Sequence, residues 1–419
     1  MKLRVMMFSD SYLPKIDGVG ISTDRFCRIL AKKGHEFLIC APLYEKDNHM
    51  GNDKNIRVER FGNVSLPSYP DVKIVLPARK KLDRLVKEFR PHLIHFHTPG
   101  ILGQFGIAVS QKHKIPLIGT YHTMMNELGT YLSPIRLLRL DRLLSRFMKN
   151  KGVRKAVKDA ERKREKSFTN RLIFRITNRV YEKGQVIITP TELVKKELEL
   201  FGVMTPIVII SNGMDLSLFK GKAKKKPHSP PRLLHVGRLA HEKNCDVVLR
   251  AFARIHEKIP GATLTFTGDG PSRESLEKEA RELGLQNQVS FTGFIPHEKL
   301  PEIYAAHDLF VTASTMETQG LVVLEALAMG LPAVGVDAYA LPEVIQNGLN
   351  GYIVHPFDSE GLAAAIASIL QNHDLYARFS EASLQIASAH EVHSCAEKLE
   401  KLYLRVAKGE FAHSSSGNR

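Results

Sequence analysis

Two acidic side chains stand eight residues apart in TMETQGLVVLEALAMG, residues 315–330. Glu317 precedes a polar turn, and Glu325 lies among good helix formers, so we expect a helix to begin near Gly320. On one helix, eight residues would separate the carboxylates by about 12 Å along the axis, too far for a shared proton. We therefore expect the two carboxylates to make separate contacts.

The expected helix start is suited to an anion. The backbone N–H groups of Gly320 and Leu321 would lie at the positive end of the helix dipole. A carboxylate only accepts hydrogen bonds, so Glu325 suits vicinal hydroxyls such as those of a ribose, and Glu317 would face sugar hydroxyls. A plainer alternative stays open, in which Glu317 complements the helix dipole and Glu325 is a solvated helix residue.

Two cations follow a predicted strand in HVGRLAHEKN, residues 235–244. Arg238 stands at the end of the strand, and Lys243 comes just before the next expected helix. An Arg fork and a Lys point charge on one loop can together hold a diphosphate. Solvated surface cations are the alternative interpretation.

A glycine pair follows the first predicted strand in SDSYLPKIDGVGIS. Gly18 and Gly20 precede an expected helix around residues 22–33, where a ligand could approach backbone N–H groups. The spacing matches neither the GxGxxG fingerprint of nicotinamide-binding proteins nor the GxxxxGK[ST] loop of P-loop kinases. A simple tight turn remains the alternative.

Three histidines lie at the ends of two further predicted strands. We expect His122, which closes PLIGTYH, to serve a polar site, and His95 and His97 in HFHTP to be satisfied structural histidines. A metal would need a third ligand at suitable spacing, and the sequence shows none. The sequence therefore predicts no metal site.

Short apolar segments alternate with amphipathic helical segments along almost the whole chain. This alternation is typical of parallel sheets covered by helices on both faces, so we expect an α/β fold with two doubly wound, Rossmann-like domains. Ligands of such sheets bind beyond the carboxyl ends of the strands, where the residues above lie. The expected strands are LRVMMFSD, FLICAP, HLIHFHT, PLIGTYH and VIITPT, then RLLHVGRL, TLTFTGDG, VSFTGFI, DLFVTAS, LPAVGV and GYIV.

Length and composition agree with two globular domains. The chain has 419 residues, of which 43% are hydrophobic and 25% charged. Its apolar runs are shorter than the roughly 18 to 20 residues of a membrane span, and MKLRVMMFSD is expected to be a buried strand, not an export signal. The four scattered cysteines suit reduced thiols in the cytoplasm.

The expected boundaries follow from these segments. Residues 1–215 would form the N-terminal domain and residues 231–390 the C-terminal domain. Residues 216–230, rich in charge and proline, would link them. A helix at residues 391–408 could pack back on the N-terminal domain, and residues 409–419 would form a flexible tail.

Most of the net charge of +16 lies in one basic segment near residues 135–183. It holds about 17 Lys or Arg against about 5 Asp or Glu. Its first part, PIRLLRLDRLLSRFMK, places apolar side chains opposite arginines, a pattern that fits a helix in an anionic membrane interface. An RNA-binding helix would carry the same charge, and packing of the leucine face on the N-terminal domain is a third alternative.

Together these stretches resemble the family 4 glycosyltransferases, retaining enzymes of the GT-B fold in which two Rossmann-like domains face a central cleft. The likeness covers nearly the whole chain, rests on the order of its motifs, and is nearest to the branch that glucosylates diacylglycerol. The matching stretches are FSDSYLPKIDGVGIS, GTYHT, SNGMD, HVGRLAHEKN, FTGDGPSRESLE and ETQGLVVLEALAMGLPAVG.

The resemblance implies that five side chains contact a nucleotide sugar. Arg238 and Lys243 would hold its diphosphate, and Glu325 would bind its ribose. Glu317 would contact the donor sugar, with His122 beside it. The chain lacks a DxD motif, so no metal is expected to bridge the phosphates.

Backbone amides complete the donor site that the resemblance implies. These amides would bind the sugar and the phosphate. Four belong to the consecutive residues Thr318, Gln319, Gly320 and Leu321, and the fifth belongs to Gly18 of the glycine pair.

The resemblance also implies the reaction. A hexose, expected to be glucose from UDP-glucose, would pass to a membrane lipid such as diacylglycerol with retention of configuration. The leaving phosphate would help to deprotonate the incoming hydroxyl, and neither a cofactor nor a nucleic-acid partner is expected. The basic segment would hold the enzyme peripherally on the cytoplasmic face of the cell membrane.

Three alternatives remain open. The long insert GVRKAVKDAERKREKSF departs from the diacylglycerol branch, so the acceptor could instead be a phosphatidylinositol, a lipopolysaccharide core or a sugar phosphate. A nucleotide-sugar epimerase of GT-B architecture would share the nucleotide site. A nucleic-acid-binding protein without catalytic activity would account for the charge alone.

Overall fold

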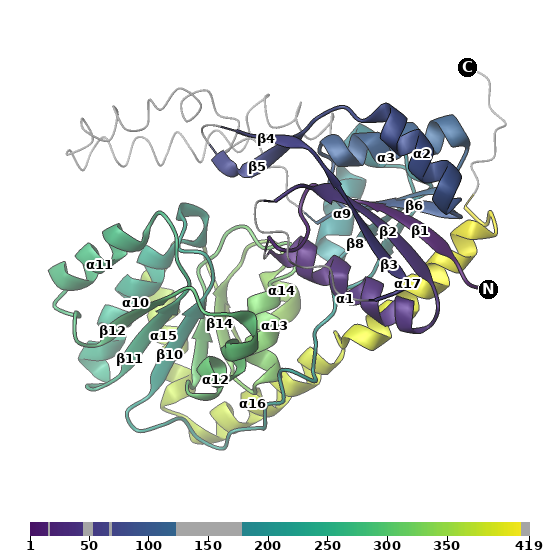
Figure 1. The fold of residues 1–419 in the computed structure, drawn as a ribbon. Helices are drawn as coiled ribbons and strands as arrows, with labels where there is room; N and C mark the ends of the chain where they lie inside the picture. The colour runs from purple at the N-terminus through teal and green to yellow at the C-terminus, as the bar shows by residue number, and fades with distance from the viewer. Residues whose placement is uncertain (16, 45–52, 67–68, 123–177, 412–419) are drawn as a thin grey trace. The chain divides into compact units, whose positions relative to one another are not determined.

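The computed structural model describes residues 1–15, 17–44, 53–66, 69–122 and 178–411. The chain divides into two compact units, coloured by residue number in Figure 1. Unit 1 comprises Met1–Pro190, Lys195–Ile210 and Ala396–Arg419, and unit 2 comprises Thr191–Val194 and Ser211–Cys395. Most of the basic segment near residues 135–183, and residues 412–419 of the expected tail, lie outside the described residues.

Unit 1 is built on a seven-stranded parallel sheet in the order β3-β2-β1-β6-β7-β8-β9. Its strands are β1 (Arg4–Phe8), β2 (Glu36–Pro42), β3 (Ile56–Phe61), β6 (Leu93–Phe96), β7 (Leu117–Thr120), β8 (Val186–Thr189) and β9 (Ile207–Ile209). Its helices within the described residues are α1 (Gly18–Lys32), α2 (Arg79–Phe89), α3 (Ile101–His113), α9 (Glu192–Leu200) and α17 (Val392–Ala407), the last two being shared with unit 2.

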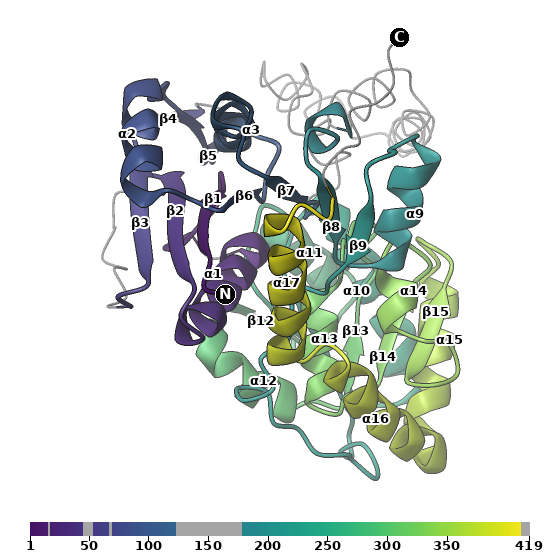
Figure 2. The same ribbon diagram turned by 90° about the vertical axis from the view of Figure 1, so that its right-hand side faces the viewer.

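Helices cover both faces of this sheet (Figure 2). Neighbouring residues of a strand point to opposite faces. In β1, Met7 Sδ lies 3.3 Å from Cys27 Sγ of α1, whereas Phe8 lies against α3, where a Cβ on Gly106 would come within 2.8 Å of its ring. The two helices therefore pack on opposite faces, and both faces of β1 are buried.

The helix α17 docks on the same face as α1. Glu400 of α17 accepts hydrogen bonds from Lys33 Nζ at 2.7 Å and from His35 Nε2 at 3.0 Å. His35 Nδ1 in turn accepts the Leu3 N–H at 3.2 Å, which leaves the His35 proton on Nε2. The middle of α17 is thus tied to the start of β1 and the end of α1.

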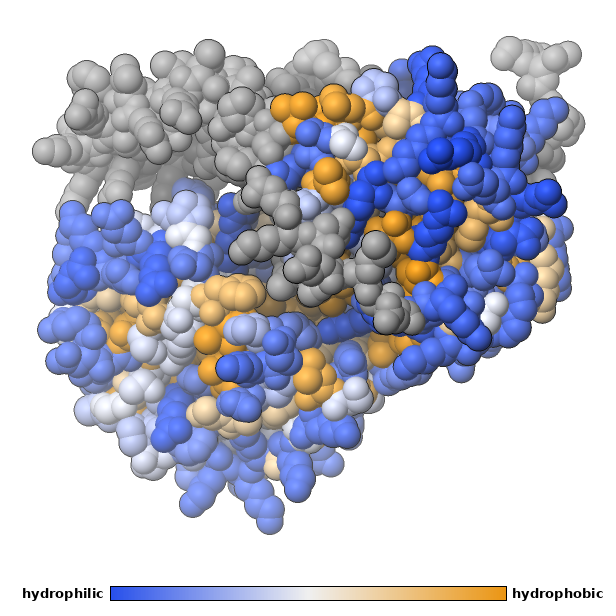
Figure 3. All heavy atoms as spheres, in the orientation of Figure 1, coloured by the Kyte–Doolittle hydropathy of each residue, from blue (hydrophilic) through white to orange (hydrophobic). Residues whose placement is uncertain are grey.

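An antiparallel hairpin of β4 (Asn63–Leu66) and β5 (Tyr69–Val75) extends from unit 1. Val64 pairs with Ile74, and Leu76 lies two residues further along the same strand direction, so the three side chains share one face. They are 57%, 38% and 49% exposed. Figure 3 shows the resulting apolar area over the hairpin.

Unit 2 contains a six-stranded parallel sheet in the order β12-β11-β10-β13-β14-β15. Its strands are β10 (Arg232–Val236), β11 (Thr263–Thr267), β12 (Val289–Gly293), β13 (Leu309–Val311), β14 (Ala333–Val336) and β15 (Gly351–Val354). The helices are α10 (Cys245–Lys258), α11 (Arg273–Glu282), α12 (Leu300–Ala305), α13 (Leu321–Ala328), α14 (Leu341–Val344), α15 (Ser359–Leu370) and α16 (His373–Ser388), with 3₁₀ turns η1 (His241–Lys243) and η2 (His297–Lys299).

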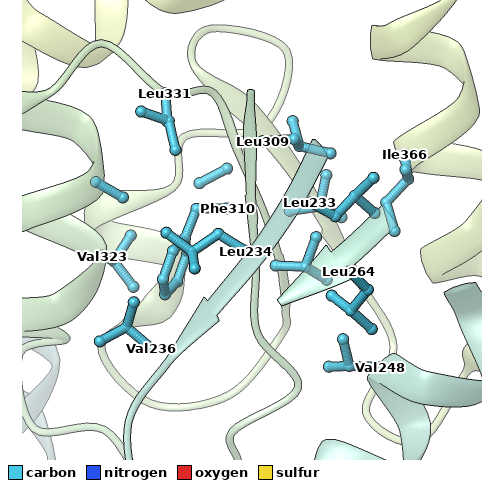
Figure 4. Close-up of a cluster of buried hydrophobic side chains, with 14 of the residues drawn as sticks. Leu233, Leu234, Val236, Val248, Leu264, Leu309, Phe310, Val323, Leu331 and Ile366 are labelled. Carbon is cyan, nitrogen blue, oxygen red and sulfur yellow. The ribbon is translucent and has the colours of Figure 1, made fainter. Parts of the chain in front are cut away.

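The core of unit 2 lies on both faces of its sheet (Figure 4). Leu233 and Leu234 are consecutive in β10 and point to opposite sides. Leu233 lies on the side of Val248 and Ile366, from α10 and α15, and Leu234 on the side of Val323 from α13. Two parallel sheets buried on both faces confirm the predicted α/β class with two Rossmann-like domains.

The stretch expected to link the domains packs on unit 2. Phe219 is 1% exposed and belongs to the core of that unit. Gly221 lies so close to helix α13 that a Cβ would be 2.2 Å from Met329 Cα, and the Lys224 N–H donates to Ser380 Oγ at 2.8 Å. Charge and proline content predicted a linker here, and the structure packs its first half on unit 2 through Phe219, Gly221 and Lys224.

Candidate functional site

Two loops that follow adjacent strands meet at the carboxyl edge of the unit 2 sheet. The loop after β10 contains η1, and the loop after β13 leads into α13. Asn244 joins them, because its side-chain amide donates to Ala313 O at 3.1 Å and to Thr315 Oγ1 at 3.2 Å. The Thr315 N–H adds a bond to Glu242 O at 3.2 Å. Asn244 adopts a left-handed conformation (φ 47°), which Asn tolerates better than most residues.

Lys243 and Glu317 form an ion pair across these loops. Lys243 Nζ donates to Glu317 Oε1 at 2.5 Å, and the side chains are 20% and 15% exposed. The sequence predicted both as site residues but did not pair them. Arg238, two residues beyond the end of β10, has an exposed side chain. The carboxyl edge of the sheet thus carries two cations, Arg238 and Lys243, on the loop after β10. Glu317 on the loop after β13 pairs with Lys243.

The helix α13 begins where the sequence predicted. Gly320 is its N-cap with φ 74°, a conformation that favours glycine, and Leu321 is its first residue. The first backbone N–H groups of any helix lack partners within the helix, so those at this end are available to an acceptor. Thr318 is half-buried on the loop leading to this end.

The Gln319 side chain braces the local backbone. It is 1% exposed, its Oε1 accepts the Asn212 N–H at 2.9 Å, and its Nε2 donates to Ser211 Oγ at 2.5 Å. Because both ends of its amide are occupied, Gln319 can offer a ligand its backbone N–H but hardly its side chain.

Glu325 lies in the second turn of α13 and is buried. Its Oε2 accepts the Tyr304 hydroxyl at 2.9 Å, and its Oε1 lies 3.0 Å from His297 Nε2. Burial and the neighbouring carboxylate hold the pKa of Tyr304 well above its usual value, so the phenol keeps its proton and donates. Glu325 is therefore not the solvated helix residue of the plainer interpretation, and each of its oxygens retains a second lone pair for a ligand hydroxyl.

A pair of glycines after β11 shapes the edge beside Arg238. A Cβ on Gly268 would lie 2.0 Å from Gly237 O, and one on Gly270 would lie 2.4 Å from Leu239 O. The Leu239 N–H donates to Asp269 O at 3.0 Å. This close backbone contact holds the Arg238 loop, and sequence reasoning assigned it no role although FTGDG stood out.

Tyr304 and His297 were also missed by sequence reasoning. Both come from the segment before β13, and neither stands in a recognisable motif. The position of PHEK directly after the predicted strand VSFTGFI points to His297 at that edge of the sheet, but it indicates neither Tyr304 nor a contact with Glu325.

In unit 1, His122 and His97 lie together at the ends of neighbouring strands. His122 follows β7, His97 follows β6, and His97 Nδ1 lies 3.0 Å from His122 Nε2. His97 Nδ1 is also 3.3 Å from Thr23 Oγ1 of α1. Burial, and secondly the other two imidazoles, lower the pKa of His97 well below its usual value, so His97 is neutral.

His95 fits the prediction of a satisfied structural histidine. Its Nδ1 lies 2.7 Å from the Tyr403 hydroxyl of α17, and its Nε2 lies 2.6 Å from Thr120 Oγ1. Burial, with a smaller contribution from His122, lowers the pKa of His95 to about 3. His97 differs from the prediction, because its buried Nε2 has no hydrogen-bond partner among the described residues.

Gly18 is the first residue of α1 and is exposed. Asp17 caps this helix, accepting the Gly20 N–H at 2.8 Å. A helix end rather than an isolated turn thus follows the first strand.

Within the described residues, no group of three or more His, Cys, Asp or Glu side chains could hold a metal ion. The helices described there are also too short or too polar to cross a bilayer.

Comparison with known families decides what kind of protein this is. Residues 16–218 match the family described as Glycosyltransferase Family 4, and residues 219–385 match Glycosyl transferases group 1. The chain is a family 4 glycosyltransferase of the GT-B fold. The resemblance noted from its motifs is thereby confirmed.

This glycosyltransferase is similar over most of its length to three relatives. It is 27% identical to an alpha-monoglucosyldiacylglycerol synthase of Streptococcus pneumoniae, over 88% of this chain and 78% of the relative. It is 25% identical to the enzyme of the same name from Acholeplasma laidlawii, over 96% and 97%. A glycogen synthase of Mycobacterium tuberculosis is 26% identical over 97% of this chain and 96% of the relative.

Solved structures share the fold. An Anabaena protein, HepE, in complex with UDP aligns with a TM-score of 0.70 at 20% identity, covering 96% of this chain and 99% of that chain. The sucrose-phosphate synthase of Thermosynechococcus elongatus aligns with a TM-score of 0.73 at 18% identity, covering 98% and 100%.

Proposed function

We propose that this glycosyltransferase moves glucose from UDP-glucose to diacylglycerol, with retention of configuration and without a metal. The observation that carries the proposal is the Lys243–Glu317 pair, which joins the loop after β10, where Arg238 also lies, to the loop that leads into α13. Two relatives named as alpha-monoglucosyldiacylglycerol synthases support this donor sugar and acceptor. The α-linked product in their name matches retention from an α-configured donor.

The two cations would hold the donor diphosphate. Arg238 offers a planar fork of N–H donors and Lys243 a point charge, while the α13 N-terminus adds the backbone N–H groups of Gly320 and Leu321. Lys243 has a counter-charge in Glu317. Binding would let Lys243 share its three hydrogens between the diphosphate and Glu317.

Acidic side chains would recognise the hydroxyls. Glu317, with one oxygen on Lys243, would accept from the donor sugar, and Glu325 would accept from the ribose. Tyr304 and His297 orient the Glu325 carboxylate from two sides. In unit 1, we assign His122 to the donor sugar and the backbone at Gly18 to the donor phosphate.

The chemical step follows from these roles. The bond between the anomeric carbon and the phosphate oxygen breaks, and the acceptor hydroxyl oxygen bonds to the same face of that carbon. The hydroxyl proton passes to the departing phosphate. Preorganised donors at developing charge each contribute about 3 kcal/mol to lowering such barriers, so Arg238, Lys243 and the helix end are suited to this task.

The surface of unit 1 supports the proposed membrane location. The hairpin exposes Val64, Ile74 and Leu76 on one face, and the exposed cations Arg79 and Lys80 begin the next helix. Apolar side chains followed by cations suit the interface of an anionic bilayer. We place the enzyme peripherally on the cytoplasmic face of the membrane, where diacylglycerol would reach it.

One assay tests donor, acceptor and metal independence together. The purified protein is incubated with UDP-, GDP- and ADP-sugars, with EDTA or with Mg²⁺, and with vesicles of phosphatidylglycerol that contain or lack diacylglycerol. We expect a glucosyldiacylglycerol, by mass spectrometry, from UDP-glucose alone and equally in EDTA. Glucose transfer to another lipid, a glucan or a sugar phosphate would overturn the acceptor, and no turnover of any donor would overturn the enzyme assignment.

A further inference from the structure

Three elements that follow neighbouring strands of unit 1 converge on one buried imidazole. Thr23 comes from the helix after β1, His97 from the end of β6, and His122 from the end of β7. The order of these strands in the sheet is β1-β6-β7. His97 Nδ1 lies 3.0 Å from His122 Nε2 and 3.3 Å from Thr23 Oγ1, and the His97 and His122 rings stack with centroids 5.3 Å apart.

The two imidazoles can share their hydrogen bond in two ways. Either His97 Nδ1–H donates to His122 Nε2, or His122 Nε2–H donates to His97 Nδ1. A neutral ring carries one N–H, so the second arrangement would place the His97 proton on Nε2. That atom is buried and has no partner among the described residues.

The first arrangement is the less costly one. A buried N–H without an acceptor is rarer in proteins than an acceptor with an unused lone pair. With the His97 proton on Nδ1, the bond to His122 is made and only the Nε2 lone pair goes unused. Burial and the neighbouring imidazoles lower the pKa of His97, which keeps a second proton off the ring.

We propose that His97 is a positioning residue, which donates its Nδ1–H to His122 Nε2 and so keeps the His122 proton on Nδ1, where it can donate to the transferred sugar. The inference rests on the proposed function, in which His122 contacts that sugar. It adds a residue that never touches the substrate and fixes both the tautomer and the ring orientation of one that does.

His95 lies next to His97 but does not decide the position of its proton. Its ring centroid lies 4.1 Å from that of His97, and both of its nitrogens contact hydroxyls, those of Tyr403 and Thr120. Because hydroxyls can both donate and accept, His95 accommodates either tautomer. The proton position is therefore decided at His97 and not at His95.

Three substitutions of His97 separate donation from packing. The amide nitrogen of Asn is three bonds from Cα, like Nδ1, and that of Gln is four bonds away, like Nε2. His97→Asn can therefore replace the donated hydrogen, whereas His97→Gln places its amide elsewhere and His97→Leu removes the donor. Thermal unfolding of each variant shows whether it is folded.

Transfer kinetics with UDP-glucose and diacylglycerol vesicles provide the first readout. We expect His97→Asn to keep kcat within about threefold of the unsubstituted enzyme, and His97→Gln and His97→Leu each to lose about tenfold or more in kcat with a smaller change in KM. Equal kcat values for the three folded variants, with His122→Ala impaired, would overturn the inference and leave the proposed function standing. A normal His122→Ala enzyme would overturn both roles.

The tautomer itself provides a second readout, which needs no substrate. In ¹⁵N-histidine spectra, assigned with the His97 and His122 variants, we expect His122 to be protonated on Nδ1 and unprotonated on Nε2. His97→Leu should release this preference and His97→Asn should keep it. A His122 protonated on Nε2 in the unsubstituted protein would overturn the inference even if the enzyme transferred no sugar.

Discussion

Lys243 Nζ lies 2.5 Å from Glu317 Oε1, although the two residues are 74 positions apart in the chain. They meet because β10 and β13 are neighbours in the sheet and each is followed by a loop at the same edge. The pair fixes the ammonium group before any ligand arrives. A charge held in place in this way needs little reorganisation when the leaving diphosphate develops its own charge.

Removing either cation of this edge should slow transfer. We expect Lys243→Ala and Arg238→Ala each to reduce kcat/KM for UDP-glucose by about tenfold or more, because each would lose the charged contact to the diphosphate that we propose. Steady-state transfer assays check this. Lys225→Ala and Arg378→Ala, which alter exposed cations elsewhere on unit 2, are the matched controls. Near-normal turnover of the first two variants would refute their assignment.

The Tyr304 hydroxyl should affect nucleotide affinity. Tyr304→Phe removes the donor 2.9 Å from Glu325 Oε2 and would let the carboxylate turn away from the proposed ribose position. A hydrogen bond to a charged group contributes about 1.5 to 3 kcal/mol, so we expect UDP to bind about tenfold more weakly by isothermal titration calorimetry. Tyr352→Phe, whose ring packs edge-on against Phe379, should bind UDP normally. Equal affinities in both variants would remove Tyr304 from the site.

Gly268 should tolerate no side chain. Its φ is 128°, and a Cβ would lie 2.0 Å from Gly237 O, so Gly268→Ala must displace the backbone beside Arg238. Gly284 has φ 71° and nothing within 4 Å of its Cβ position, so it isolates the conformational cost alone. We expect Gly284→Ala to lose about 1 kcal/mol in the stability of unit 2 and Gly268→Ala clearly more, and we expect only Gly268→Ala to weaken UDP binding. Similar denaturation midpoints for the two variants would contradict this.

The buried imidazoles should make the protein sensitive to acid. Burial lowers the pKa of His235 to about 4 and that of His95 to about 3, so both are neutral in the folded state. An unfolded histidine titrates near 6.5, so below about pH 6.5 the unfolded chain binds more protons than the folded one. The stability is therefore complete above that pH and is lost as pH falls towards 4, by up to about 1.4 kcal/mol per pH unit for each histidine.

Chemical denaturation at pH 7 and pH 5 measures this loss. His235 Nδ1 donates to Val311 O at 2.9 Å. In His235→Asn the side-chain amide can replace this donor, but it cannot titrate. We expect it to lose less stability between the two pH values than the unsubstituted protein. An unaltered pH dependence in His235→Asn would show that this imidazole does not titrate as expected.

The α/β class could be predicted because each strand of a doubly covered sheet must be apolar on both faces. The run RVMMF in β1 shows this, with Met7 and Phe8 packed against different helices. The start of α13 was also predictable, because a left-handed N-cap favours glycine and Gly320 is followed directly by helix formers. In both cases local chemistry alone decides the structure.

Partners from distant segments could not be predicted in the same way. Nothing in the spacing of Lys243 and Glu317 shows that they touch, since that depends on the order of strands in the finished sheet. Tyr304 contacts Glu325 because of how α12 packs on α13, which no motif records. The core position of Phe219 could not be predicted either, because it is a single aromatic residue ahead of a run of lysines.

Phe219 also determines where this chain can be cut. If unit 2 were exchanged with that of a related enzyme, a junction in the lysine-rich stretch after residue 220 would look simplest. That junction would leave Phe219 outside the exchanged segment, although its ring belongs to the core of unit 2. Joints near residue 210 and residue 395 would keep the ring with its neighbours. In chimaeras built for altered donor preference, the exchanged segment should therefore begin near residue 210, ten residues before the lysine-rich stretch.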